Sequence, residues 1–128
     1  MVSLPDTNEV RRSLEGLGFY VCIDFFMFEG SRYADVVLPG STWSKDEGVT
    51  ANGEGRVVKI NKAAEPPGEA RADWWIVQEI ARRMGREKYF TFDGPRAIFD
   101  EMRVASRGGN ADYYGITWEK IQQNSGIL

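Results

Sequence analysis

The segment FYVCI, residues 19–23, limits the folds open to this chain more than any other stretch, because five apolar side chains follow one another. A strand with one wet face alternates polar and apolar residues, whereas a strand without alternation is covered on both faces, as in a parallel sheet. This strand ends at Asp24, and a second short strand, residues 35–38, is closed by Pro39. We therefore expect an α/β fold with a short parallel sheet.

Helix signals flank these strands. A capping box at residues 6–9 begins a first helix, which ends at Gly16 or Gly18. The strongest helix is expected at about residues 72–84, with Gly85 as its stop. Another begins at Pro95 and runs to about residue 106, and Thr117 caps a last short helix. The side chains expected to face inward are Val10, Leu14, Leu17, Trp74, Val77, Ile80, Ala81, Met84, Ile98, Phe99, Met102, Trp118 and Ile121.

The number of strands is small for the number of apolar residues. The chain has 128 residues, of which 42% are hydrophobic, and this is the size of one ordinary domain. Two or three short strands make a thinner sheet than a doubly wound fold normally has. We therefore expect residues 1–128 to form a single partial domain, Rossmann-like in type. The missing strands are then supplied by chain outside this sequence or by a partner.

Composition excludes several classes of function. Histidine is absent and Cys22 is the only cysteine, which removes Ser-His-Asp and Cys-His catalysis, HExxH zinc sites and thiolate clusters. The net charge is -3 without a basic stripe, so nucleic acid is not an expected partner. Asp24 interrupts the longest apolar run, so no membrane segment is expected. We see no signal peptide before the first helix pattern, and expect the cytoplasm, with the periplasm left open.

A loop rich in glycine and small residues follows the second strand. It runs from Gly40 to Gly55 and holds small, acidic and glycine residues. It contains neither a GxGxxG motif nor a P-loop lysine pattern. Two interpretations stay open at this point. The loop is a flexible surface connection, or it is a cradle in which Gly48, Gly53 and Gly55 let the backbone approach a ligand. Arg56 then opens a segment that is expected to form a hairpin or an edge strand.

Two carboxylates are expected at the ligand-binding edge of the sheet, because ligands of open α/β sheets bind beyond the carboxyl ends of the strands. Ile23 and Asp24 end the first strand, and Asp73 stands in the first turn of the longest helix. Asp24 is either a solvated strand end or an acceptor for ribose hydroxyls. Asp73 either complements the helix dipole or accepts a planar pair of N–H groups, such as the edge of guanine.

These residues lie within a series of segments that resembles a known family. The segments are DFFM (24–27), YADVVLPG (33–40), Trp43, EG (47–48), Asn52, EGR (54–56), PPGEAR (66–71), DWW (73–75), IFDEMR (98–103) and ADYYGITW (111–118). In this order and at this spacing they resemble the molybdopterin oxidoreductases, which use bis-molybdopterin guanine dinucleotide. Formate dehydrogenases and nitrate reductases belong to this family.

The resemblance implies a place inside a larger enzyme. The chain looks like the second half of the Rossmann-like domain that holds one of the two guanine dinucleotides of the cofactor. The metal of this cofactor is molybdenum or tungsten. The iron–sulfur cluster and the residue that ligates the metal would lie in other parts of the polypeptide, which is then the partner of this segment. Catalytic residues and metal ligands are not expected here, so the isolated chain should be inactive. The implied substrate is a small oxyanion or a one-carbon acid.

The residues that the family uses carry over unevenly. Asp24 matches the acid for the guanosine ribose, and Asp73 matches the acid for the guanine edge. Asp46 is a further cofactor-binding candidate, but it is acidic where the family often has a basic residue or histidine, and this departure argues against a nucleotide contact there. Arg56 either pairs with Glu54 or approaches a phosphate. The family's Thr-Glu-Thr is replaced by Phe-Glu-Gly at residues 28–30, so both threonine hydroxyls are lost.

Two other functions remain open on the sequence. The large iron–sulfur subunit of respiratory complex I has a similar domain with similar motifs, and there the chain would be structural. The second alternative is a free-standing binding module, a separately encoded subunit that docks onto the missing parts of the enzyme. An exposed sheet edge in the isolated chain would favour the second one.

Overall fold

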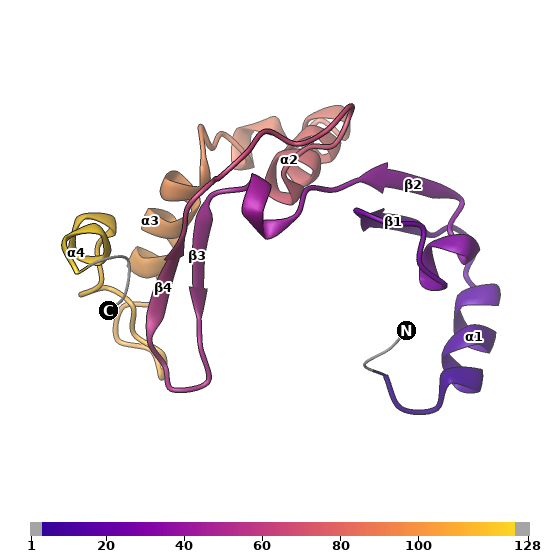
Figure 1. Ribbon diagram of the computed structural model, residues 1–128, viewed down its shortest axis with the longest axis horizontal. Coiled ribbons are helices and arrows are strands. Elements are labelled where there is room, and N and C mark those ends of the chain that lie inside the picture. The colour runs from indigo at the N-terminus through magenta and orange to yellow at the C-terminus, as the bar shows by residue number, and fades with distance from the viewer. Residues whose placement is uncertain (1–3, 125–128) are drawn as a thin grey trace.

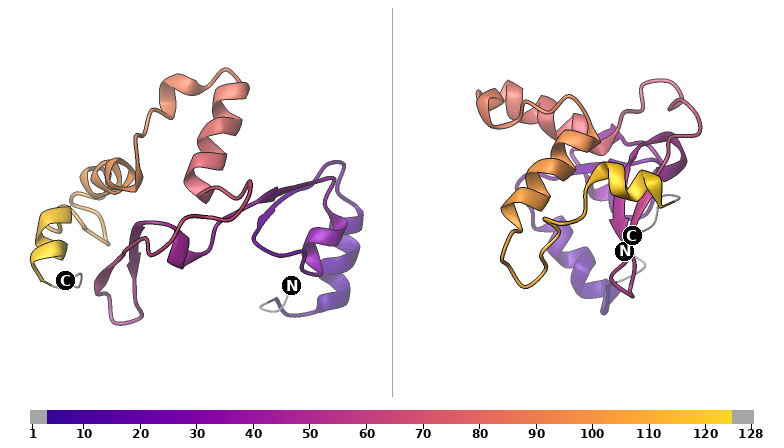
Figure 2. Two further views of the ribbon diagram at one scale, coloured as in Figure 1. Left: turned by 45° about the horizontal axis from the view of Figure 1, so that its top comes forward. Right: turned by 90° about the vertical axis from the view of Figure 1, so that its left-hand side faces the viewer.

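A computed structural model describes residues 4–124 of this protein, which form an open arch rather than a sphere (Figure 1). The N-terminal helix and a parallel strand pair make one end of the arch, and a hairpin with two helices makes the other. The helix between them, residues 73–83, is seen from two further sides in Figure 2. In chain order the elements are α1 (Thr7–Glu15), β1 (Val21–Asp24), η1 (Gly30–Tyr33), β2 (Val36–Pro39), η2 (Trp43–Lys45), β3 (Gly48–Ala51), β4 (Val57–Ile60), α2 (Asp73–Arg83), η3 (Glu87–Tyr89), α3 (Pro95–Ala105) and α4 (Trp118–Gln123), where η marks a 3-10 helix.

The expected short parallel sheet is present. β1 and β2 pair in parallel, with Val21 opposite Val36 and Asp24 opposite Pro39. Beyond the end of β2, Gly40 makes a further parallel bridge to Arg71, two residues before α2 begins. This bridge places the start of α2 beside the carboxyl ends of both strands. The mixed α/β class predicted from the apolar strands is confirmed.

Local signals set the helix ends. Asp6 caps α1 by accepting a hydrogen bond from the Glu9 N–H at 3.1 Å, while the Glu9 carboxylate pairs with Arg12. The helix ends at Gly16, as expected. Pro95 is the first residue of α3, and the Thr117 hydroxyl caps α4 by accepting from the Lys120 N–H. These ends follow from residues within one turn of the boundary, which is why the sequence predicts them well.

The loop expected at residues 40–55 is wrong in part. It contains η2 and the strand β3, which pairs antiparallel with β4 to form a hairpin. The Asn52 side chain closes the hairpin turn by accepting from the N–H groups of Glu54 and Arg56, each at 3.0 Å. Gly53 and Gly55 therefore serve a β-turn, and only Gly40 of the glycines discussed there lies at the carboxyl edge of the parallel sheet.

The largest group of buried apolar side chains lies where the β3–β4 hairpin packs against α3 and α4. Val57 of β4 packs with Phe99 of α3 and with Trp118 and Ile121 of α4, and all four are at most 4% exposed. The partly buried side chains around this cluster are Val49, Tyr113 and Ile116. The expected inward positions Phe99, Trp118 and Ile121 are therefore confirmed.

The expected inward faces of the other helices are wrong in part. On α2, Ile76 and Ala81 are buried, whereas Val77 and Met84 are 45% and 72% exposed. Met102 of α3 is exposed, and α1 has no buried residue. Periodicity shows that a helix has an apolar face, but the neighbouring element decides which row of that face is covered. The described residues supply few such neighbours.

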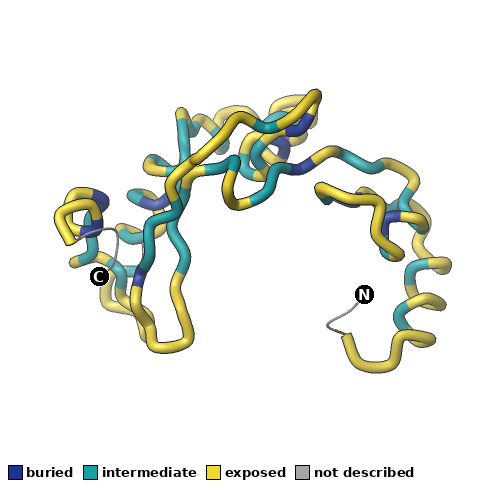
Figure 3. Tube along the Cα trace, in the orientation of Figure 1, coloured by how far each residue is buried: buried dark blue, intermediate teal, exposed yellow. Residues whose placement is uncertain are grey.

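The surface of the chain is large for its mass. It exposes 9087 Å², whereas a compact monomer of 14.5 kDa exposes about 6,900 Å². Of β1 only Cys22 is buried, and Val21 and Phe19 are exposed (Figure 3). We expected packing on both faces of β1, but residues 4–124 do not supply the elements that would cover both faces. None of the described helices has the length and hydropathy needed to cross a membrane.

Candidate functional site

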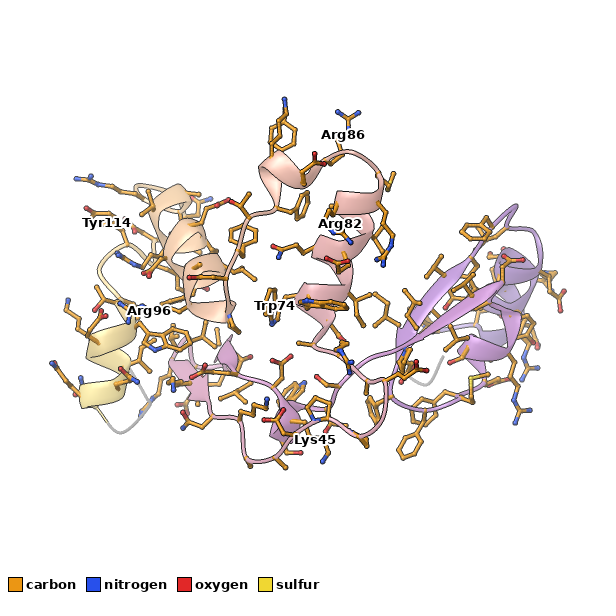
Figure 4. All side chains as sticks on the ribbon, turned by 90° about the horizontal axis from the view of Figure 1, so that it is seen from above. Lys45, Trp74, Arg82, Arg86, Arg96 and Tyr114 are labelled. Carbon is orange, nitrogen blue, oxygen red and sulfur yellow. The ribbon has the colours of Figure 1, made fainter. Side chains whose placement is uncertain are left out.

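A cavity of about 600 Å³ lies where β1 and β2 end and α2 begins. Figure 4 shows Trp74 at this end of α2, while Arg82 and Arg86 mark the far end of the helix and the turn that follows it. The strand ends and the helix N-terminus meet here because the bridge between Gly40 and Arg71 extends the sheet. The residues that line the cavity are Ile23, Asp24, Phe25, Gly40, Ser41, Thr42, Trp43, Ser44 and Asp73.

Asp24 is held at the end of β1 by the backbone that follows it. Its Oδ1 accepts hydrogen bonds from the N–H groups of Phe25 at 2.8 Å and Phe26 at 3.4 Å. Its main-chain carbonyl accepts from the Gly40 N–H at 3.1 Å, which ties the ends of the two strands together. The carboxylate is therefore oriented through Oδ1, while Oδ2 accepts no hydrogen bond from residues 4–124.

Gly40 allows the three chain segments to approach one another. A Cβ atom on this residue would lie 2.7 Å from Oδ1 of Asp73 and 3.1 Å from Cγ2 of Ile23. The first distance is shorter than real Cβ contacts, so a side chain here would displace the Asp73 carboxylate. Glycine at this position thus brings Ile23, Asp24 and Asp73 to one cavity.

Asp73 is the first residue of α2, and its carboxylate accepts no hydrogen bond from residues 4–124. Although the residue as a whole is exposed, Oδ1 lies against Gly40. The pKa of Asp73 is raised above that of an ordinary aspartate, first by burial of the carboxylate and then by the charges of Asp46 and Asp24. The helix dipole would lower the pKa, so burial and repulsion outweigh it. A carboxylate with a raised pKa and no donor among residues 4–124 is typical of a binding site.

Asp46 stands behind the cavity wall. It follows η2, and it accepts hydrogen bonds from the Glu47 N–H at 2.8 Å and the Ser41 hydroxyl at 3.4 Å. It does not line the cavity, but its charge raises the pKa of Asp73. Asp24 and Asp46 thus have donors from the protein, whereas Asp73 has none among the described residues.

Arg56 lies apart from this group. It follows the turn of the β3–β4 hairpin, where its Nε is 3.1 Å from Oε2 of Glu54, and both side chains are exposed. It is not among the residues that line the cavity. The structure therefore shows the pairing with Glu54, one of the two alternatives that the sequence left open.

Sequence reasoning missed five residues of the cavity wall. Two are aromatic, Phe25 and Trp43, and three carry hydroxyl groups, Ser41, Thr42 and Ser44. The Thr42 and Ser44 hydroxyls are 3.3 Å apart. A signal was available, because Phe25 directly follows β1 and the other four lie within five residues of the end of β2, and ligands of α/β sheets bind beyond strand ends. Treating residues 40–55 as one loop obscured it.

The cavity wall combines carboxylates, hydroxyl groups and aromatic rings. Carboxylates accept hydrogen bonds and hydroxyl groups donate them, so the wall suits a polar ligand with N–H or O–H groups and an anionic part. Among residues 4–124, no group of three or more His, Cys, Asp or Glu side chains is arranged to hold a metal ion.

Comparison with known proteins gives this cavity a context. The family model described as molybdopterin oxidoreductase matches residues 1–83. The assimilatory nitrate reductase catalytic subunit of Bacillus subtilis (strain 168) is 45% identical over 127 residues, which are 98% of this chain and 18% of that protein. The F420-dependent formate dehydrogenase 1 subunit alpha of Methanococcus maripaludis is 40% identical over 121 residues, covering 94% of this chain and 17% of that protein.

A solved structure agrees with the sequence matches. Acetylene hydratase from Pelobacter acetylenicus superimposes with a TM-score of 0.66 and 29% identity, covering 91% of this chain and 15% of that one. The chain thus spans less than one fifth of the length of each of these proteins. Their names denote a reductase, a dehydrogenase and a hydratase, so likeness to this segment does not select one reaction.

Proposed function

Because this chain belongs to the molybdopterin oxidoreductase family, we propose that it is the part of such an enzyme that holds one guanine dinucleotide of the cofactor. The observation that carries the proposal is the Asp73 carboxylate, which faces the cavity without a donor from the described residues. A guanine base offers two parallel N–H groups on one edge, N1–H and N2–H. A carboxylate accepts such a pair with both oxygens.

The other cavity residues fit the remaining parts of a nucleotide. Asp24 ends a strand of an α/β sheet, the position from which a carboxylate accepts the hydroxyl groups of a ribose. The hydroxyls of Ser41, Thr42 and Ser44 donate to phosphate oxygens. Ile23 and Gly40 form the floor and allow close approach. Arg56 and Asp46 have no direct contact in this proposal, and Asp46 acts through its charge on Asp73.

The role of this segment in catalysis is to bind and orient. The bound cofactor supplies the electron-transfer chemistry, and the protein positions it. We propose a nitrate reductase or a formate dehydrogenase as the parent enzyme, acting on a small oxyanion or a one-carbon acid. Molybdenum or tungsten, the metal ligand and any iron–sulfur cluster are assigned to chain outside this segment. Residues 1–128 are then one partial domain, and the isolated chain is expected to be inactive.

Partners and compartment follow from the same proposal. The rest of the oxidoreductase polypeptide is the partner that covers the exposed apolar surface of this chain. The reported relatives are nitrate reductases and formate dehydrogenases, which favours this function over a structural domain of complex I or a free-standing module. We propose the cytoplasm as the compartment, although the relatives include a periplasmic nitrate reductase of Desulfovibrio desulfuricans.

A titration with three nucleotides tests the function. Calorimetry of the 128-residue chain is expected to give the highest affinity for GDP and about tenfold lower affinity for IDP, which lacks the N2 amino group. ADP, whose base edge presents an acceptor to Asp73, is expected to bind weakest. Equal affinities for GDP, IDP and ADP would mean that Asp73 does not read a guanine edge.

Lowering the pH is expected to weaken guanine binding, and to do so at a higher pH than an aspartate of ordinary pKa would. Only the ionised carboxylate of Asp73 accepts both N–H groups, and its pKa is raised by burial, Asp46 and Asp24. Guanosine, which has no phosphate to titrate, should therefore lose affinity as pH falls through this raised value. In Asp46→Asn the loss should move to lower pH, because one repelling charge is gone. Identical pH profiles for the two proteins would contradict this electrostatic coupling.

Gly40→Ala is expected to damage the cavity. The added methyl group would meet the Asp73 carboxylate and Ile23, so the cost in unfolding free energy should be about 1–3 kcal/mol. Gly48→Ala is the matched control, because a Cβ there has no atom within 4 Å and its φ is not positive. Urea unfolding measures both variants, and GDP titration should show weaker binding only in Gly40→Ala. Equal unfolding midpoints for the two variants would show that the contact at Gly40 is relaxed at no cost.

A further inference from the structure

Two aromatic side chains line the cavity but take no part in the contacts proposed above. Phe25 is 51% exposed and Trp43 is 74% exposed. An indole left open to water presents a large apolar face without a partner in the buried hydrophobic cluster of the described residues. Ligand cavities commonly combine such faces with a few placed polar groups.

The ring of Phe25 is positioned by its neighbours and still accessible. Its own N–H binds the carboxylate of Asp24, so the ring starts directly beside the ribose acceptor. Its centroid lies 5.2 Å from the tilted ring of Phe26 and 5.9 Å from the ring of Phe28, which stands edge-on. These contacts support the ring from one side, and the exposed half remains free for a ligand.

Trp43 reaches the same cavity from the neighbouring strand. It is the first residue of η2, which follows the end of β2, and its carbonyl accepts a hydrogen bond from the Asp46 N–H at 3.3 Å. Thr42 and Ser44, on either side of it, also line the cavity. The backbone of this turn is thus ordered by local hydrogen bonds, while the indole lies outside any hydrophobic cluster of the described residues.

We propose that Phe25 and Trp43 form an aromatic platform that stacks on the purine base of the nucleotide. The inference rests on the proposed guanine-nucleotide site and adds a contact to the face of the base, whereas Asp73 contacts its edge. The sugar and the phosphates have no π-face, so the base is the part of the ligand that matches two aromatic rings. Stacking tolerates any base, so the platform contributes affinity and Asp73 contributes the choice of guanine.

The test is calorimetric titration of the 128-residue chain with GDP and IDP. Phe25→Leu and Trp43→Leu are each expected to weaken both nucleotides by about tenfold, with the ratio of GDP to IDP affinity unchanged. Phe25→Tyr and Trp43→Phe keep a ring and should stay within about twofold of the unsubstituted chain. Tyr89→Leu, a substitution of an exposed aromatic residue in η3, is the control that should change nothing. GDP should also quench tryptophan emission, and this quenching should be lost in Trp43→Phe.

The outcomes separate this inference from the proposed function. No binding of GDP to the unsubstituted chain would overturn both. GDP binding that depends on Asp73 but is equal in the chain and its two leucine variants would overturn the platform alone. Equal losses in the leucine and the ring-keeping variants would also overturn it, because the effect would then not depend on an aromatic face. Circular dichroism of each variant confirms that these exposed substitutions leave the fold intact.

Discussion

Asp73→Asn is expected to remove most of the cofactor from an enzyme that contains this segment, while leaving the fold as stable as before. The carboxylate is proposed to accept two hydrogen bonds from guanine, and the asparagine amide would turn a donor toward one of them. Loss of charge-assisted bonds of this kind costs about 3 kcal/mol, a factor of about one hundred in affinity. Molybdenum per polypeptide is the measurement.

A chimera makes this measurement possible. The homologous segment of the Bacillus subtilis assimilatory nitrate reductase catalytic subunit, 45% identical to this chain, is replaced by residues 1–128. Glu9→Gln, which changes a first-turn carboxylate of α1, is the matched control for a helix-dipole effect. It should keep the molybdenum content of the chimera. Equal metal content in the two variants would contradict the role of Asp73.

The effect of Asp73→Asn on stability has a predictable sign. The pKa of Asp73 is raised in the folded chain, so the folded state binds the proton more tightly than the unfolded state. Stability therefore falls as pH rises from the unfolded pKa through the raised folded pKa, and this loss is fully present at neutral pH. Asparagine removes the charge, so the unfolding free energy at neutral pH should be unchanged or higher. A large destabilisation would instead indicate a structural role.

Trp118→Ala is expected to have the largest effect on stability. Trp118 is 4% exposed, and its ring lies 6.2 Å from that of Phe99 and 5.1 Å from Nζ of Lys59. Removing a buried tryptophan costs about 3–5 kcal/mol, a large share of the stability of a domain of this size. The hairpin, α3 and α4 should lose their packing together, because Val57, Phe99 and Ile121 share the same cluster. Urea unfolding followed by circular dichroism measures the loss.

Trp75→Ala is the matched control for this substitution. Trp75 is on α2 and is 39% exposed, so its removal should cost about 1 kcal/mol. A destabilisation by Trp118→Ala no larger than that of Trp75→Ala would show that the C-terminal cluster does not hold the fold together. GDP titration of Trp118→Ala is a second measurement. It reports on the cavity at the ends of β1 and β2, which is lined by none of the cluster residues.

Features that depend on a few neighbouring residues could be predicted from the sequence. Gly85 stops α2 in a backbone conformation with φ 69°, Pro95 begins α3 and Thr117 caps α4. The parallel pairing of β1 and β2 followed from two apolar strands in succession. Asp24 and Asp73 were predicted to share one edge of the sheet because ligands of α/β sheets bind at the carboxyl ends of strands, and both line the cavity there.

Features that depend on distant pairing could not be predicted in this way. β3 has four residues, GVTA, and becomes a strand only because β4 pairs with it. The hairpin holds Arg56 at Glu54, outside the cavity wall, and the sequence alone could not decide between this pairing and a phosphate contact. Burial of Ile76 rather than Val77 on α2 depends on which neighbour covers the helix. The wall formed by Ser41 and Trp43 was missed for the same reason, since η2 was taken as part of one long loop.

A crystal structure of the chimera with its cofactor tests the central claim most directly. The account predicts a guanine base in the cavity at the ends of β1 and β2, with N1 and N2 within hydrogen-bond distance of the two Asp73 carboxylate oxygens. The ribose hydroxyl groups should lie at Asp24. A folded chimera in which the base binds elsewhere, or in which Asp73 faces solvent beside a bound cofactor, would contradict the proposal that this segment holds a guanine dinucleotide.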